Sequence, residues 1–204
     1  MKVIGLTGSI ASGKSTVATM LKNAKIYVID ADELARRVQA PGMPAFFEMV
    51  GRFGVDVLKP DGSLDRAKLA NIVFNDSSAL SDLENIVHPK IEQLRLEEMA
   101  RLEKEGHEVV VYMAPLLFEK QLHKKLDKTI LIVAKEEVLI ERMAKRDGFS
   151  QEEAKRRLAL QMSNEEKMAY ADEIIENSGT IDELFNQLQI VWKRLCNVLL
   201  VLPS

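Results

Sequence analysis

Five short runs rich in β-branched residues alternate with longer segments of helical spacing, and this alternation constrains the fold more than any other feature of the sequence. Runs of this length and composition are typical of strands that are buried on both faces. Strands that alternate with helices pair in parallel through right-handed crossovers. The sequence therefore predicts an α/β fold, a parallel five-stranded sheet flanked by helices. The predicted strands are Lys2–Thr7, Lys25–Ile29, Val109–Met113, Thr129–Val133 and Glu173–Ile175.

The interval of about 31–107 interrupts the alternation, because it holds no convincing strand and several helical pieces. Leu80, Leu83 and Val87 form an apolar stripe at helical spacing, and Pro89 is expected to open a second, charged helix. We predict that this interval is a helical insertion over the carboxyl edge of the sheet. That edge is where open α/β sheets bind their ligands.

Composition narrows the class of protein. Lys and Arg number 28 against 31 for Asp and Glu, so the formal charge of −3 lacks the basic surplus typical of nucleic-acid binders. The single cysteine, Cys196, favours a reducing compartment. The apolar start is too short for a signal peptide, and no run approaches the roughly 18 apolar residues of a membrane span. We expect a cytoplasmic protein that binds neither nucleic acid nor a membrane.

Residues 8–16 match the phosphate-binding pattern G-x-x-x-x-G-K-[ST] between a predicted strand and a predicted helix. Gly8 and Gly13 allow backbone N–H groups to converge on a phosphate, and the helix that follows directs its positive end at the same anion. Lys14 is the expected cation for the β- and γ-phosphates, and the Ser15 hydroxyl is the expected Mg²⁺ ligand. The motif predicts that ATP or GTP is bound.

Two absences bear on how the nucleotide is used. The guanine-reading pattern N-K-x-D does not occur, and the third strand runs into Ala114-Pro115 without the acidic residue of a hydrolytic ATPase. The second strand offers a carboxylate instead. Asp30 is expected to cap a helix, and Asp32 either orients an acceptor hydroxyl and takes its proton, or holds a magnesium-bound water. The structural alternative for Asp32 is a favourable charge in the first helical turn.

Arginines near the fourth strand complete a set typical of kinases. Arg142 and Arg146 lie four residues apart on one predicted helix, an arrangement that favours an anion between them. The alternative is a solvated basic face. The turn Asp147-Gly148-Phe149 then has the character of a hinge, and the next helix carries Arg156 and Arg157. We predict an arginine-bearing lid that excludes water from the reaction.

Three predicted helices begin at a capping box, in which a hydroxyl side chain and a glutamate three residues later bind each other's backbone N–H groups. The boxes are Ser150 with Glu153, Ser163 with Glu166, and Thr180 with Glu183. The predicted organisation is one domain, 1–204, with a core of residues 1–30 and 108–204, the helical insertion of about 31–107 and a lid of about 147–170.

The remaining polar candidates are weaker. Asn177 and Gly179 follow the last strand, where they form either a simple turn or a contact to a purine edge. His88 precedes Pro89, so we expect it in extended backbone beside a helix start, with the acceptor cleft as its functional option. His107 and His123 are expected on the surface. No cluster has metal-ligand spacing, so the only expected metal is Mg²⁺ bound with the nucleotide.

In this order, the motifs resemble the dephospho-coenzyme A kinase family of P-loop kinases over nearly the whole chain. The matching segments are Ile4 to Thr16, Asp30-Ala31-Asp32, Leu64-Asp65-Arg66, Ile72-Val73-Phe74, His88-Pro89, Pro115-Leu116-Leu117-Phe118-Glu119, Ala171-Asp172 and Asn177-Ser178-Gly179. The phosphate-binding motif alone is shared with very many proteins. The ordered set at these separations is far more specific.

The resemblance implies ATP-dependent phosphorylation of the ribose 3′-hydroxyl of dephospho-CoA, the last step of coenzyme A synthesis, with Mg²⁺ bound at Ser15. It implies catalytic roles for Lys14, Asp32 and Arg142. The resemblance implies that Ala11, Ser12, Gly13, Lys14, Ser15 and Thr16 bind ATP and that Asn177 and Gly179 lie on its adenine side. Together with the residue patterns above, the full set of candidates for ATP binding adds Gly8 and Arg146, and the candidates for acceptor binding are Asp32, Arg66 and His88.

The chain departs from the family pattern at two positions. Met113 stands where many members have an acid, and Ala11 replaces a commoner glycine, which we expect to be tolerated if its φ is negative. Two alternative functions remain at this stage, a nucleoside or nucleoside-monophosphate kinase and a non-catalytic nucleotide sensor. The expected state is a monomer or a small homo-oligomer.

Overall fold

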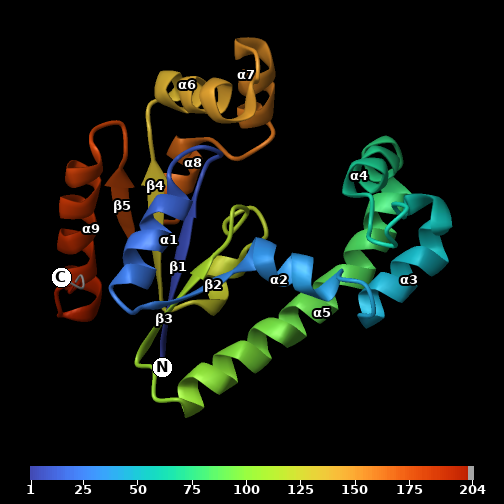
Figure 1. Ribbon diagram of the computed structural model, residues 1–204. Coiled ribbons are helices and arrows are strands. Elements are labelled where there is room, and N and C mark those ends of the chain that lie inside the picture. Colours follow the sequence, from blue (N-terminus) through green and yellow to red (C-terminus); the bar gives the residue numbers. More distant parts are fainter. Residues whose placement is uncertain (202–204) are drawn as a thin grey trace. The chain divides into compact units, whose positions relative to one another are not determined.

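The computed structural model describes residues 1–201 of the chain. It divides into two compact units. We call the first the sheet unit; it comprises Met1–Val28 together with the chain from Gly106 onward. The second, the helical unit, comprises Ile29–Glu105. Figure 1 shows the elements of both units along the chain.

Five strands form one sheet in the order β2-β3-β1-β4-β5. Their bounds are β1 Lys2–Gly8, β2 Tyr27–Asp30, β3 Val109–Met113, β4 Lys128–Val133 and β5 Glu173–Glu176. β1 pairs in parallel with both β3 and β4, and β4 pairs in parallel with β5. The predicted parallel five-stranded sheet is therefore confirmed.

β2 begins two residues later than predicted. Lys25 has a φ of 63°, and its N–H donates to Lys22 O at 3.0 Å. A residue in the left-handed region cannot continue an extended strand, so Lys25 belongs to the turn after the first helix. The apolar pattern at Lys25–Ile29 did not reveal this turn.

The sheet unit also contains the helices that flank the sheet or follow its strands. Their bounds are α1 Lys14–Asn23, α6 Glu136–Asp147, α7 Gln151–Ala159, α8 Asn164–Met168 and α9 Ile181–Cys196, with a short 3₁₀ turn, η2, at Leu122–Lys125. α1 and α9 pack on one face, where Leu21 and Trp192 are buried against Ile4 of β1 and Ile132 of β4. Burial of these large apolar side chains is the main stabilising contribution to this face.

Two of the three predicted capping boxes are complete, at Ser163 and at Thr180. The third is half formed. The Ser150 hydroxyl accepts the Glu153 N–H, but the Glu153 carboxylate pairs with Arg156 and Arg157 on its own helix. The prediction of a reciprocal box at Ser150 was wrong, because two guanidinium groups compete for the carboxylate.

The helical unit contains α2 Ala31–Val38, α3 Pro44–Phe53, the 3₁₀ turn η1 Val55–Val57, α4 Arg66–Asn75 and α5 Ser77–Lys104. Its own core is built around Phe46, Met49, Leu69 and Val87. Within the described residues, no helix in either unit combines the length and the apolar character that crossing a bilayer requires.

α5 is one continuous helix of 28 residues with Pro89 in its interior, so the prediction of a helix start at Pro89 was wrong. A proline inside a helix removes one hydrogen bond and costs about 3 kcal/mol or more. Val87 before it and Ile91 and Leu94 after it pack into the same core, which offsets this cost. His88 is consequently helical rather than extended.

Candidate active site

The loop between β1 and α1 requires glycine at both ends. A Cβ on Gly8 would lie 2.3 Å from Ile132 O and 2.5 Å from Ser12 Oγ, and a Cβ on Gly13 would lie 2.1 Å from Asn177 Nδ2. Gly13 also has a φ of 101°, a region that favours glycine. Ser12 is fully buried, and its Oγ has no hydrogen-bond partner within the described part of the chain. The predicted phosphate-binding motif thus adopts a tight turn with close contacts.

Ala11 lies at the turn of this loop with a φ of 61°. The condition under which alanine was expected to be tolerated here, a negative φ, is therefore not met. The left-handed region brings the Cβ of an L-residue against its own backbone at a cost of roughly 1–2 kcal/mol. The family's commoner glycine avoids this cost, so the loop conformation is kept here in spite of the side chain.

Ala11→Gly is therefore expected to raise the free energy of unfolding. Relief of this strain of roughly 1–2 kcal/mol is offset in part by the roughly 0.4–1 kcal/mol by which glycine stabilises the unfolded chain, which leaves a net gain of up to roughly 1.6 kcal/mol. Urea denaturation checks this. The matched control is Ala144→Gly, at an exposed position inside α6, which should instead lose about 1 kcal/mol. Equal losses in both variants would contradict the interpretation of strain at Ala11.

A cavity of about 570 Å³ opens over this loop within the sheet unit. Its charged side chains are all cationic, so its electrostatic character suits a polyanion. The cavity brings together most of the predicted nucleotide-binding residues, while Gly8 and Ser12 are not in its lining. The lining residues are Ala11, Gly13, Lys14, Ser15, Thr16, Arg142, Lys145, Arg146, Asn177, Gly179, Ile181 and Leu184.

Lys14 is folded back over the loop. Its Nζ donates to Gly8 O at 2.7 Å and to Ser9 O at 2.9 Å. From α6, Arg142 reaches the same loop and donates through Nη1 to Ala11 O at 3.4 Å. These contacts with backbone carbonyls hold two cations at the edge of the cavity, where phosphate oxygens would bind.

Arg146 makes a different contact from Arg142. Its Nε and Nη2 donate to the two carboxylate oxygens of Asp147, at 2.9 and 2.7 Å. This pairing lowers the pKa of Asp147 and raises the pKa of Arg146. The two arginines predicted to share an anion therefore line one cavity with different partners, and a phosphate at Arg146 would compete with Asp147.

Asn177 supports the loop from below. Its side chain is buried, and its Nδ2 donates to Ser12 O at 2.7 Å, while its backbone N–H donates to Val133 O at 2.8 Å. One N–H of this amide is therefore engaged by the loop, and Asn177 also lines the cavity. Gly179 leaves room for the helix cap of α9, since a Cβ there would lie 1.9 Å from Glu183 Oε2.

The other three predicted site residues belong to the helical unit. Asp32 lies in the first turn of α2, where Asp30 Oδ1 accepts the Asp32 N–H at 2.9 Å, which confirms Asp30 as the cap. Arg66 begins α4 and lines a cavity of about 440 Å³ in that unit together with Arg36 and Lys59.

His88 is half exposed within α5, and its Nε2 lies 3.9 Å from Glu84 Oε1. Among residues 1–201 there is no group of three His, Cys, Asp or Glu side chains that could hold a metal ion. The Ser15 hydroxyl, which lines the cationic cavity, fits a Mg²⁺ ion whose other ligands are phosphate oxygens and water.

Sequence reasoning missed several residues of the site. Lys145 adds a cation to the cavity, and Ile181 and Leu184 give it an apolar side. It also missed Lys167, which is fully buried below the loop and pairs with Glu119. The position of Lys145 on the same predicted helix as Arg142 and Arg146 could have suggested it, whereas nothing in the sequence predicts a buried lysine at 167.

Comparisons with known proteins show the family to which the chain belongs. The sequence profile described as Dephospho-CoA kinase matches residues 2–183. A "Dephospho-CoA kinase" of Bacillus cereus (strain ZK / E33L) is 45% identical over 192 residues, which cover 94% of this chain and 96% of the relative.

Two solved structures are similar over nearly their full length. A protein from Thermus thermophilus is 38% identical, with a TM-score of 0.82 and coverage of 95% of this chain and 97% of that one. The dephospho-CoA kinase from Campylobacter jejuni is 33% identical, with a TM-score of 0.73 and coverage of 97% and 98%. The chain thus has the kinase-type fold that its sequence predicted, and it belongs to the dephospho-CoA kinase family.

Proposed function

We propose that the protein transfers the γ-phosphoryl group of ATP to the ribose 3′-hydroxyl of dephospho-CoA, giving coenzyme A and ADP as the last step of coenzyme A synthesis. The observation that carries the proposal is the cationic cavity over residues 8–16, in a chain of this family. Phosphoryl transfer depends mainly on positioning and on stabilising charge at the phosphates, and this cavity offers both.

The nucleotide side of the reaction is assigned to the sheet unit. Backbone N–H groups of the loop and the Lys14 ammonium bind the β- and γ-phosphates, and Arg142 and Arg146 bind the charge that develops during transfer. Ser12 and Thr16 are the other residues of the phosphate-binding motif that we assign to ATP binding. Asn177 and Gly179 lie on the adenine side, with Asn177 acting through the loop that it supports.

A Mg²⁺ ion bound by the Ser15 hydroxyl and the nucleotide would neutralise phosphate charge.

The acceptor side is assigned to the helical unit. Arg66 binds an anionic group of dephospho-CoA, and His88 contributes to the acceptor surface. Asp32 orients the 3′-hydroxyl and takes its proton as the new P–O bond forms and ADP leaves with the electron pair of the broken one.

The helical insertion of about 31–107 and the lid of about 147–170 are proposed to close over bound substrates. An open site would let water take the phosphoryl group in place of the acceptor. Hydrolysis of ATP without acceptor should therefore be much slower than transfer. Equal rates would contradict closure.

The test is a coupled assay of ADP release with dephospho-CoA, AMP and CMP as separate acceptors. We expect turnover with dephospho-CoA alone, and a product with one added phosphate by mass spectrometry. Turnover with AMP or CMP while dephospho-CoA is inert would replace the proposal with a nucleoside-monophosphate kinase. Turnover no faster than that of Lys14→Ala with every acceptor would favour a nucleotide sensor.

The proposal also covers the location of the enzyme and its oligomeric state. We place the enzyme in the cytoplasm, where its substrates are small molecules, as a monomer or a small homo-oligomer that binds no nucleic acid. The slightly negative charge balance supports the absence of nucleic-acid binding. Light scattering at several protein concentrations measures the oligomeric state.

A further inference from the structure

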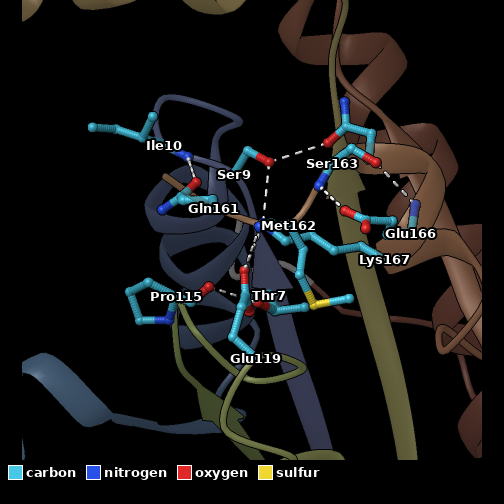
Figure 2. A network of polar contacts seen from close by, with 12 residues as sticks. Thr7, Ser9, Ile10, Pro115, Glu119, Gln161, Met162, Ser163, Glu166 and Lys167 are labelled. Atoms are coloured by element: carbon cyan, nitrogen blue, oxygen red, sulfur yellow. Dashed lines mark hydrogen bonds and ion pairs between the residues drawn. The ribbon is translucent and has the colours of Figure 1, made fainter. Parts of the chain in front are cut away.

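A buried ion pair lies directly below the phosphate-binding loop. Lys167 of α8 has no exposed surface, and its Nζ lies 3.2 Å from Glu119 Oε1 (Figure 2). A buried ammonium without a carboxylate partner would be strongly destabilising. However, apolar residues of the same size often stabilise a fold at least as well as such a pair. Stability alone therefore gives little reason for a lysine here.

The pair is connected to the loop through Ser9. Lys167 Nζ donates to Ser9 Oγ at 3.3 Å, and Ser9 Oγ donates to Asn164 Oδ1 at 3.1 Å. The next residue is held as well, since the Ile10 N–H donates to Gln161 Oε1 at 3.1 Å. Figure 2 shows that the contacts of Gln161 and Lys167 converge on the loop, the first from the connection between α7 and α8 and the second from α8. We call residues 161–167 the support segment.

Glu119 connects the support segment to the part of the chain that follows β3. It lies in the turn that follows β3, and its Oε1 accepts the Met162 N–H at 3.3 Å as well as the Lys167 ammonium. The same turn contacts the end of β1, where Thr7 Oγ1 donates to Pro115 O at 3.3 Å. The support segment, which contacts the loop, is thus joined to the turn after β3 by one ion pair and one hydrogen bond, and that turn contacts the end of β1.

Ser9 also contacts the cation that faces the cavity. Its carbonyl oxygen accepts from Lys14 Nζ at 2.9 Å and from the Ser12 N–H at 3.1 Å. A shift of Ser9 would therefore move an acceptor of Lys14 and the turn that directs backbone N–H groups toward phosphate. A displacement of about 1 Å at such groups can reduce a rate by roughly 100-fold.

We infer that Lys167 and Glu119 are positioning residues for phosphoryl transfer: their ion pair fixes Ser9, and through it the loop and the Lys14 ammonium, against the support segment. This inference rests on the proposed function for its kinetic consequence only. Neither side chain lines the cationic cavity over the loop, so neither is assigned a contact with the nucleotide.

The test is the double variant Glu119→Gln with Lys167→Met. It leaves no orphan charge, and the new amide oxygen at position 119 can still accept the Met162 N–H. We expect a melting temperature within about 5 °C of the wild type. We expect kcat with dephospho-CoA to fall roughly 10- to 100-fold, while ADP affinity changes less than about threefold. Amide hydrogen exchange at Ile10 and Ser12 should accelerate by about tenfold or more.

The matched control is an ion pair of the same unit that has an exposed arginine in place of the buried lysine, Glu173 with Arg194, whose atoms lie 3.2 Å apart. Glu173→Gln with Arg194→Met should alter neither kcat nor exchange at Ile10. If the double variant at 119 and 167 does not fold, Ser9→Ala decides the question, because it removes the hydroxyl that connects the pair to the loop. The inference is overturned if the folded double variant at 119 and 167, or folded Ser9→Ala, keeps both the wild-type kcat and the wild-type rate of amide exchange at Ile10 and Ser12.

The two proposals fail in different ways. A wild-type protein that does not phosphorylate dephospho-CoA ends the proposed function, yet exchange at Ile10 still reports whether the ion pair holds the loop. Faster exchange in the double variant then supports the positioning role, and unchanged exchange contradicts it.

Discussion

Lys14→Ala is expected to lower kcat roughly 10²- to 10³-fold, the usual effect of removing one preorganised donor from a site of charge development. The Lys14 ammonium is held over the loop by Gly8 O and Ser9 O, so little reorganisation is needed when charge builds up on the γ-phosphoryl group. The measurement is kcat and KM with dephospho-CoA at saturating ATP.

A loss of phosphate binding must be separated from a loss of folding. Lys22→Ala on the same helix removes an exposed lysine from the last turn of α1 and should leave kcat unchanged. The melting temperature of Lys14→Ala should stay close to that of the wild type. A fully folded Lys14→Ala protein with undiminished kcat would exclude the Lys14 ammonium from the chemistry of phosphoryl transfer.

The sheet could be predicted from sequence because its signals are local. β3 begins and ends at the predicted residues, since Val109–Met113 is an uninterrupted apolar run. The phosphate-binding loop could be predicted for the same reason, because its glycines, Gly8 and Gly13, stand at a fixed spacing between one strand and one helix.

What could not be predicted depends on contacts between distant residues. Pro89 is a strong local signal for a helix start, but packing of Val87 and Ile91 into one core overrides it. Lys167 follows a capping box and has the local character of a surface lysine. Only the fold brings it to Glu119, 48 positions earlier in the chain, and buries it beneath Ser9.

Asp32→Asn is expected to reduce kcat by roughly 10²- to 10⁴-fold, the usual contribution of a general base, and to leave ATP affinity nearly unchanged. Asparagine has almost the same shape as aspartate but cannot take the proton of the acceptor hydroxyl. The cap of α2 should survive, because it uses the Asp30 carboxylate and the backbone N–H of residue 32. Glu33→Gln in the same helical turn is the matched control and should retain wild-type kcat.

The same variant separates the two roles that the sequence leaves open for Asp32. A ligand of the magnesium shell binds the ion more weakly when it loses its charge, so its defect should shrink as Mg²⁺ is raised. A missing base cannot be replaced in this way. We therefore expect the loss of kcat in Asp32→Asn to persist when Mg²⁺ is titrated to saturation. Recovery at high Mg²⁺ would assign Asp32 to the metal, and an unchanged kcat at every Mg²⁺ concentration would exclude it from both roles.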